Sequence, residues 1–332
     1  MSTSVNTEKQ TNTRPKWDFF SFFYKYGTLL TIVVLVVVFA LATPAFLQTN
    51  NIISILRSIS IVTIIAIGIT ISLAVNGFDL SVGSVASLSN AVVISMFVWF
   101  SQNTVVAIGA AIGAALIVGV LNSFFIVKGK IPDMLLTLAM MFIIQGIALT
   151  YTRGATISQN MIMPDSTFAE GTISPFFAKI GQVPWIILIM LLVVLAVHLF
   201  LNYTKHGRYM YIIGGNIEAA RLSGIPVNRY KTVAYLLSAL FASIGGIVLA
   251  SRVMTAEINA GAPYLMDAVA AAFIGFAVLG AGKPNAFGTF IGAVLIGVLS
   301  NGLIMMSVPY YAMDIVKGSV LAFALLLTYY KK

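Results

Sequence analysis

The segment RYMYIIGGNIEAARLSGI, residues 208–225, is the one long polar interruption in a chain that is otherwise an almost continuous series of apolar helical segments. Within it, Asn216 is a favourable helix N-cap, Glu218 places an acid in the first turn that follows, and Gly224 is a common stop signal. The sequence therefore predicts a short polar helix outside the apolar part of the chain. Such a helix is well shaped to insert into another protein.

The composition defines the class of protein. Hydrophobic residues make up 59% of the 332 residues, and only 9% are charged, which predicts an all-α integral membrane protein in a lipid bilayer. The formal charge is +9, but most cations fall between apolar segments, so nucleic-acid binding is not expected. The lack of cysteine excludes disulfides, thiolate metal sites and a cysteine nucleophile.

About ten segments are long enough to span a bilayer, which takes about 20 apolar residues. They cover residues 27–46, 51–75, 80–100, 104–127, 131–152, 183–202, 231–251, 265–282, 286–306 and 312–330. With a cytoplasmic N-terminus, 14 of the 19 Lys and Arg residues lie on the inner side. Because basic residues gather on the cytoplasmic side, both termini are predicted to be cytoplasmic.

The chain then divides into two parts. We expect residues 1–26 to form a disordered cytoplasmic tail and residues 27–332 to form the transmembrane domain. A cleavable signal peptide that ends near Ala42 is disfavoured, because the leader is long and many further spans follow.

Two polar loops are expected on the outer side, at residues 153–182 and 252–264. They are either ordinary solvated loops or a docking surface for an external partner that delivers cargo. The charged residues proposed for docking are Arg153, Asp165, Glu170, Arg252 and Glu257.

A second polar stretch, NGFDLSVGS at residues 76–84, lies between the second and third spans. An acid near membrane depth is costly, so Asp79 should face protein or a water-filled path. The stretch fits the capped start of a helix, which is the favoured interpretation, and it also fits a contact with transported solute or a gate. The candidates for the translocation pathway are Asn76, Asp79, Ser81 and Ser84. A similar break, GAGKPN at residues 280–285, separates the eighth and ninth spans.

Other chemistry is not supported by the residues. The GAGKP run lacks the first Gly of a phosphate-binding loop and has Pro where the Mg²⁺-binding Ser or Thr must stand. His198 and His206 are too isolated for a metal site. No Ser/His/Asp set or pair of acids suits an enzyme active site. We therefore expect no catalytic residues, no metal and no cofactor on this chain.

Two motifs carry a resemblance to a known family. Residues 76–84 resemble the Gly-Ile-Asp-Leu-Ser-Val-Gly-Ser signature of the ribose-type sugar ABC permeases, which serve ribose, xylose, arabinose and galactosides. Gly-Arg at 207–208 with GGNIEAARLSGI at 214–225 is similar to the cytoplasmic coupling segment of the same family. The resemblance runs from about residue 47 to the end. Phe78 replaces the usual Ile, and the Ile-x-Leu-Pro continuation of other importer classes is missing.

The resemblance implies the ABC importer permease fold, with ten helices in the bacterial inner (cytoplasmic) membrane. It implies a pathway formed by two permease copies, as a homodimer or a paralogous heterodimer. Cytoplasmic ATPase subunits would hold ATP and Mg²⁺, and a periplasmic sugar-binding protein would dock outside. Residues 203–231 would form the coupling segment. Its implied coupling residues are Gly214, Asn216, Glu218, Ala219, Ala220, Arg221 and Gly224.

We therefore expect a transport subunit, without an ATPase site of its own, that imports a monosaccharide such as a ribose-like pentose. The same architecture could import a nucleoside, a furanone signal or a branched-chain amino acid. An ion-coupled secondary transporter is a less favoured alternative, suggested by Asp79, Asp267 and Asp314 in or beside spans. Asp267, Asp314 and Lys317 could form a proton relay, but the favoured interpretation is that they are paired, helix-end or interface-snorkelling residues.

Overall fold

The computed structural model describes residues 19–163, 166–278 and 282–329, and its elements there are α-helices. The helices are α1 (Phe19–Ala42), α2 (Thr49–Leu73), α3 (Val82–Val98), α4 (Thr104–Val127), α5 (Asp133–Tyr151), α6 (Pro175–Ile180), α7 (Trp185–Tyr203), α8 (Lys205–Gly215), α9 (Ile217–Leu222), α10 (Val227–Val253), α11 (Ala262–Ala277), α12 (Ala286–Met305) and α13 (Tyr310–Tyr329). The described ranges contain two isolated β-bridges and no longer strand. The predicted all-α class is confirmed.

Six of the described helices are long and apolar enough to cross a membrane: α2, α4, α5, α7, α10 and α12. Shorter apolar helices lie within α1, α3 and α11. Each predicted span overlaps one helix, while the count of ten spans stays a prediction. Helix α1 begins at Phe19, before the predicted start at residue 27, so the last part of the predicted tail is helical. The rest of the predicted tail, residues 1–18, lies outside the described residues.

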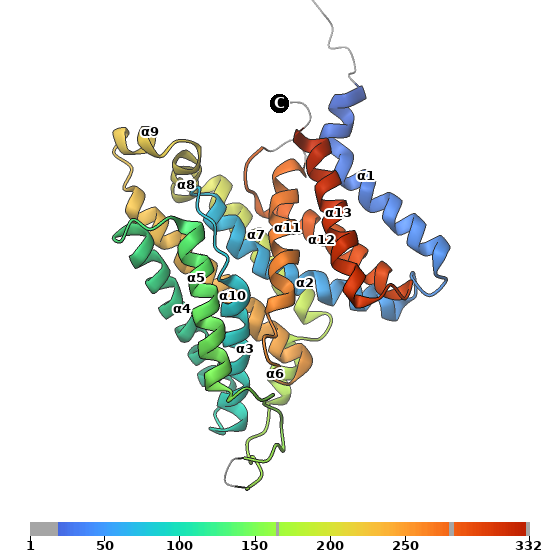
Figure 1. Cartoon of the computed structure of the whole chain (residues 1–332), viewed down its shortest axis with the longest axis vertical. Helices are drawn as coiled ribbons and strands as arrows, with labels where there is room; N and C mark the ends of the chain where they lie inside the picture. The colour runs from blue at the N-terminus through green and yellow to red at the C-terminus, as the bar shows by residue number, and fades with distance from the viewer. Residues whose placement is uncertain (1–18, 164–165, 279–281, 330–332) are drawn as a thin grey trace, which may run out of the picture.

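The centre of the bundle is formed by α2, α3 and α10. Helix α10 packs against α2, α3 and α4, and α2 packs against α10, α11 and α12 (Figure 1). Gly68 permits the close crossing of α2 and α10, since a Cβ there would lie 2.8 Å from the carbonyl oxygen of Ser238. In the most apolar stretches of α2 and α10, 67% of the residues are buried inside the protein. The corresponding fraction in α4 and α5 is 28%. The outer faces of α4 and α5 are therefore apolar surfaces of the kind that lipid covers.

The molecule has two distinct ends (Figure 1). Helices α8 and α9 lie at one end, together with the start of α1 and the end of α13. Helix α6 and the described part of the long loop before it lie at the opposite end. This is the arrangement that two termini on the same side of a membrane require, and the orientation itself stays a prediction.

Candidate functional site

The segment predicted as one polar helix forms two helices, α8 and α9. Asn216 lies between them and is the C-cap of α8 and the N-cap of α9. The N–H of Asn216 donates to the carbonyl of Ile212 at the end of α8, at 3.0 Å. Its side-chain Oδ1 accepts from the N–H of Ala219 in α9, at 2.9 Å. The predicted N-cap is therefore confirmed. Gly224 follows α9 with φ +74°, as expected of a stop signal.

The sequence did not predict α8. Its first turn is capped by Thr204, whose Oγ1 accepts from the N–H of Gly207 at 3.1 Å. Met210 and Ile213 are fully buried on its inner face. The two glycines at the end of this helix masked the pattern, because glycine is a weak helix former.

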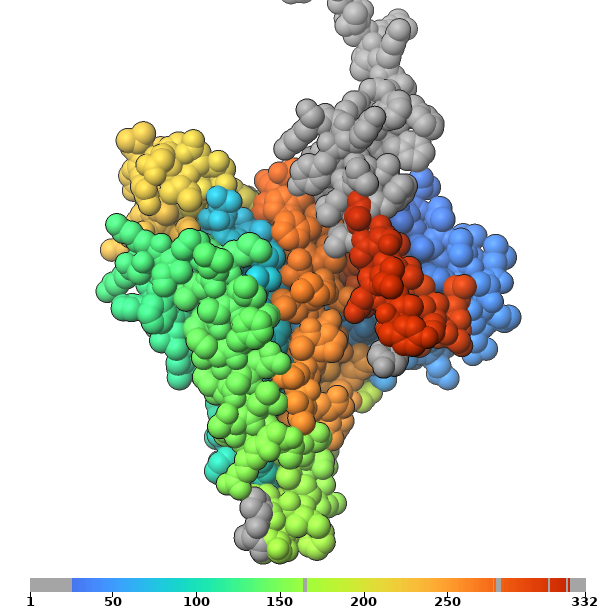
Figure 2. Space-filling view, viewed as in Figure 1, coloured from blue at the N-terminus to red at the C-terminus, as the bar shows by residue number. Residues whose placement is uncertain are grey.

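Helix α9 projects from the molecule beside α8 (Figure 2). Glu218 and Arg221 form an exposed ion pair at 2.7 Å, and the Leu222 side chain is 90% exposed. Ala220 is buried and holds α9 on the following turn, since its carbonyl accepts from the N–H of Ile225 at 3.0 Å. The exposed face of α9 thus offers charge and an apolar side chain together, and the coupling role of the residues named for it stays a prediction.

The second predicted motif forms the connection between α2 and α3, residues 74–81, and α8 lies directly on it. A Cβ at Gly214 would stand 2.5 Å from the carbonyl oxygen of Ala74. The close approach therefore requires glycine at this position of α8. The same Cβ position lies 3.6 Å from the backbone nitrogen of Asn76, so the two motifs that the sequence singled out are in contact.

Asp79 is buried in this connection and is bonded within the protein. Its carboxylate accepts from the N–H of Ser81 at 2.9 Å, from Ser81 Oγ at 2.6 Å and from Ser238 Oγ at 2.7 Å. Ser81 Oγ in turn accepts from Asn122 Nδ2 at 3.0 Å. A buried carboxylate needs several donors, and these come from the start of α3 and from α10. The network therefore fastens the connection to α10 and α4.

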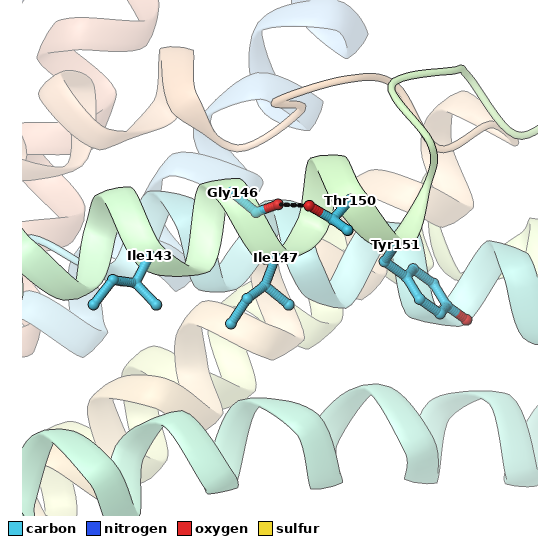
Figure 3. A pocket seen from close by; sticks show the side chains of 5 residues that line it. All are labelled: Ile143, Gly146, Ile147, Thr150 and Tyr151. Carbon is cyan, nitrogen blue, oxygen red and sulfur yellow. Dashed lines mark hydrogen bonds between the residues drawn. The ribbon is translucent and has the colours of Figure 1, made fainter.

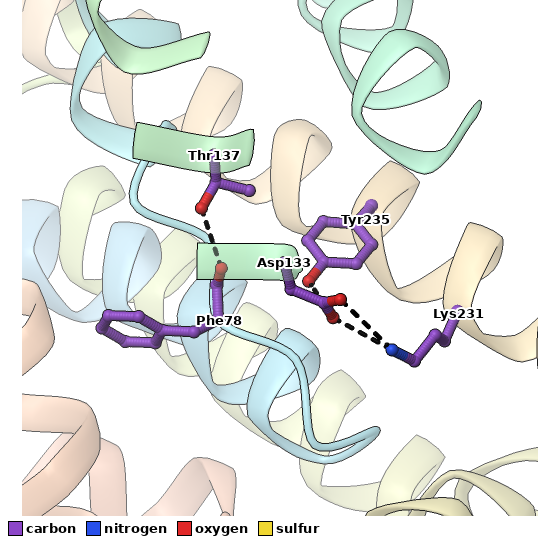
Figure 4. Close-up of polar contacts among 5 residues, drawn as sticks. All are labelled: Phe78, Asp133, Thr137, Lys231 and Tyr235. Atoms are coloured by element: carbon purple, nitrogen blue, oxygen red, sulfur yellow. Dashed lines mark hydrogen bonds and ion pairs between the residues drawn. The ribbon is translucent and has the colours of Figure 1, made fainter. Parts of the chain in front are cut away.

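A further group of polar side chains holds the same connection, and the sequence did not reveal it. Thr137 Oγ1 of α5 donates to the carbonyl of Phe78 at 2.9 Å and accepts from the N–H of Leu80 at 3.2 Å. Figure 4 shows Thr137 beside a second set of contacts one turn earlier on α5. One threonine thus satisfies two backbone groups of the connection.

The second set comprises Asp133, Lys231 and Tyr235, and together with Thr137 we call it the loop clamp (Figure 4). The Asp133 carboxylate accepts from Lys231 Nζ at 3.1 Å and from the Tyr235 hydroxyl at 2.7 Å. Tyr235 is fully buried, and the charged side chains are each 16% exposed. A Cβ at Gly77 would lie 2.5 Å from the Tyr235 hydroxyl, so a larger residue there would displace part of the clamp. The sequence offered one signal for this set: Asp133 and Lys231, of opposite charge, lie near the starts of two apolar helices.

The proposed pathway residues differ in exposure. Asp79 and Ser81 are buried in the network above, and Ser84 is buried with its Oγ donating to the carbonyl of Met141 at 2.8 Å. Asn76 is exposed, with φ +56°. Helix α3 does begin at this stretch, with Ser81 at the N-cap position, but Ser81 makes no side-chain capping bond, so the capping part of the favoured interpretation is wrong. The polar side chains bond elsewhere in the protein because the stretch is buried among α4, α5 and α10. A pathway role for the four residues stays a prediction.

Comparison with known proteins agrees with the two motifs. The family described as "Branched-chain amino acid transport system / permease component" matches residues 51–325. The chain belongs to this permease family. It is a multi-pass integral membrane protein, and the resemblance seen in the motifs is confirmed.

Several curated permeases are similar to this permease over nearly its whole length. The ribose import permease of Escherichia coli K12 is 36% identical over 302 residues, which cover 90% of this chain and 92% of the relative. The ribose import permease of Bacillus subtilis 168 is 36% identical over 324 residues, or 97% and 98% of the two chains. The xylose transport system permease of Haemophilus influenzae is 32% identical, with coverage of 90% and 94%. No solved structure matches.

The two predicted outer loops of the permease form one surface. Ile157 and Ala256, one from each loop, exchange backbone hydrogen bonds at 3.0 and 2.9 Å. The N–H of Gly181 in the first loop donates to Ser251 Oγ, near the end of α10, at 2.7 Å. Of the residues proposed for docking, Arg153, Glu170 and Glu257 are exposed, Arg252 is half-buried, and Asp165 lies outside the described residues. The docking role itself stays a prediction.

Asp267 and Lys317, from α11 and α13, form an ion pair at 3.0 Å. Their side chains are 18% and 21% exposed. A pair of this kind satisfies both charges in place, which supports the paired interpretation over a proton relay.

A depression on α5 is lined by Ile143, Gly146, Ile147, Thr150 and Tyr151 (Figure 3). The Thr150 hydroxyl donates to the carbonyl of Gly146 at 2.8 Å, and the Tyr151 hydroxyl bonds to Ser95 Oγ at 2.6 Å. Its polar groups are engaged, so the depression lacks the convergent free donors and acceptors of a sugar site.

Proposed function

We propose that this permease is the membrane subunit of an ATP-driven importer that moves a monosaccharide, such as a ribose-like pentose, into the cell. The observation that carries the proposal is the position of α9, a short capped helix that projects from one end of the bundle. Helix α9 follows α8, and α8 contacts the connection that contains Asp79. The curated relatives named for ribose and xylose transport support the choice of cargo.

The proposal assigns a partner to each end of the molecule. A cytoplasmic ATPase, which holds ATP and Mg²⁺, docks on α9, and a periplasmic sugar-binding protein docks on the joined outer loops. A second permease copy, identical or paralogous, completes the pathway in the bacterial inner membrane. The chain itself has no catalytic role. Transport then requires that the ATPase bind two permease conformations with different affinity, because only differential affinity shifts a conformational equilibrium.

Substrate affinity resides mainly in the binding protein. The buried polar groups around Asp79 are bonded to one another, as are Asp267 and Lys317. These contacts also occupy two of the acids that suggested an ion-coupled transporter. The family description includes branched-chain amino acids, whereas the relatives described above are named for sugars.

The test is purification in mild detergent with identification of the co-purifying ATPase, followed by reconstitution into vesicles with the sugar-binding proteins of the same cell. We expect ribose or xylose, loaded on one binding protein, to stimulate ATP hydrolysis and to enter the vesicles. Uptake should survive a protonophore and stop when ATP is depleted. Uptake that depends on the proton gradient, or stimulation only by a loaded amino-acid-binding protein, would contradict the proposal.

A further inference from the structure

Helix α8 contacts two different connections between membrane helices. On one side, Gly214 lies against Ala74 in the α2–α3 connection. One turn away, the Tyr211 hydroxyl donates to the carbonyl of Pro284 in the α11–α12 connection at 2.8 Å. Lys283 Nζ lies 4.4 Å from the centre of the Tyr211 ring. Residues three apart on a helix share a face, so one face of α8 joins the two connections.

The two connections that α8 contacts differ in how firmly other residues hold them. The α2–α3 connection is held by the loop clamp and by the Asp79 network, so Gly214 bears on a fixed part of the bundle. Apart from the contacts with α8, the hydrogen bonds of the α11–α12 connection in the described residues run within it or to its own two helices, and Val278 belongs to a buried apolar cluster against which α1 packs. Asn285 Oδ1 accepts from the N–H of Gly288 in α12, and its Nδ2 donates to the carbonyl of Gly275 in α11 at 3.1 Å. Movement of Pro284 therefore acts on the end of α11 and the start of α12 together.

Tyr211 is suited to transmit such movement. Its ring is half-buried, and burial raises the pKa of its hydroxyl to about 12, so the group is a protonated donor at neutral pH. Lys283 adds a cation over the ring face, a second attractive contact with the same connection. Because Asn216 ends α8 and begins α9, a displacement of α9 reaches Tyr211 through less than two turns of helix.

We infer that Tyr211 is the positioning residue through which displacement of α9 moves α11 and α12, with Gly214 as the pivot on the clamped connection. The inference rests on the proposed function, in which the ATPase displaces α9. Tyr211 contacts no substrate in this role. It sets how far each cycle of ATP binding opens or closes the bundle at α11 and α12.

The experiment uses the whole complex of permease, ATPase and binding protein in lipid nanodiscs and vesicles. Tyr211→Phe removes the hydroxyl and keeps the ring. Tyr209→Phe is the matched control on the same helix, since the Tyr209 ring packs edge-on against Tyr230 at 5.6 Å. The permease has no cysteine, so a single introduced cysteine is the one site on this chain that a maleimide labels. Leu222→Cys reports docking on α9, and Phe287→Cys, at a position 46% exposed, reports movement at the start of α12.

With Tyr211→Phe, we expect ribose transported per ATP hydrolysed to fall about fivefold, the factor that one net hydrogen bond supplies. Addition of MgATP should change the labelling rate at Phe287→Cys much less than in the wild type, whereas protection of Leu222→Cys by the ATPase should persist. Tyr209→Phe should behave as the wild type. The inference is overturned if Tyr211→Phe keeps the wild-type transport ratio and Phe287→Cys response. It is also overturned if Leu222→Cys loses its protection, since Tyr211 would then act on docking.

Failure of the proposed function has a different signature. A wild-type complex without ribose uptake would contradict the assigned cargo. The labelling comparison depends only on MgATP and the ATPase, so it still tests Tyr211 in that case.

Discussion

Lys231 Nζ and the carboxylate of Asp133 lie 3.1 Å apart and join the start of α10 to the first turn of α5. The positive end of the α5 dipole also stabilises the negative charge of Asp133. The same end of the α10 dipole disfavours the positive charge of Lys231. The ion pair with Asp133 therefore accounts for the position of Lys231. Together the two residues brace the connection between α2 and α3, on which the α8 and α9 helices rest.

Asp133→Asn should lower stability by about 2 kcal/mol, because it removes a charged acceptor from a mostly buried ammonium and from Tyr235. Thermal unfolding of the detergent-purified permease measures the effect. The matched control is Glu218→Gln, which breaks an exposed ion pair and should cost less than about 1 kcal/mol. Equal losses in the two variants would contradict the bracing role. In a double-mutant cycle, Lys231→Met should restore part of the loss.

Gly77→Ala should destabilise the permease, because the added Cβ would lie 2.5 Å from the Tyr235 hydroxyl and 2.8 Å from Asp133 Oδ2. We expect a loss of about 1–3 kcal/mol, typical of overpacking, in the same unfolding measurement. Gly215→Ala is the control, since no neighbouring atom lies within 4 Å of its Cβ position. Adding Tyr235→Phe to Gly77→Ala should recover part of the loss, and a failure to do so would place the strain elsewhere.

Ser238→Ala tests what Asp79 does, because it removes one of the three donors to this buried carboxylate. We expect a stability loss of about 1–3 kcal/mol with little change in the KM for transport. Ser319→Ala, which removes an exposed serine hydroxyl on α13, serves as the control and should leave both quantities unchanged. A changed KM with unchanged stability would instead support solute contact at Asp79.

Gly224→Val should uncouple ATP hydrolysis from uptake while the chain still inserts in the membrane. A β-branched side chain is strained at φ +74°, so the turn that ends α9 should shift. Gly224→Asn is the matched control, because asparagine tolerates this conformation better than other residues. Recovery of the ATPase in a pull-down and the transport-to-ATP ratio measure the effect. Wild-type values for Gly224→Val, and likewise for Glu218→Lys, would refute the docking role of α9.

Glu257→Lys should weaken association of the binding protein without affecting recovery of the ATPase, since Glu257 is exposed in the α10–α11 connection, next to Ala256, which bonds to the other predicted outer loop at Ile157. The affinity of the binding protein for the permease in nanodiscs, measured at low and at physiological salt, reports the change. An exposed charge contributes mostly through screened electrostatics, so the difference from wild type should shrink as salt is added. Loss of ATPase recovery in this variant would contradict the assignment of the two ends.

Much of the helix pattern could be predicted from local signals. The fourth span was predicted at residues 104–127, and the helix is Thr104–Val127, because Asn103 caps it with a side-chain bond to Val106. The ninth was predicted at 286–306 and is Ala286–Met305, after the cap at Asn285. The start of α1 and the existence of α8 were missed. In both segments, aromatic, polar or glycine residues with weaker helix propensity form helix outside the apolar stretch that hydropathy marks.

The sequence by itself determined the membrane class, the apolar segments, the capped helix at Asn216 and the family signature, because each depends on residues close together in the chain. Only the tertiary structure decided which distant residues meet. The loop clamp brings Asp133 to Lys231, and α8 brings Tyr211 to Pro284. In an apolar surrounding, a buried polar group must find a partner wherever the packed helices offer one. Those partners depend on how α5, α8 and α10 pack, and no local pattern records that packing.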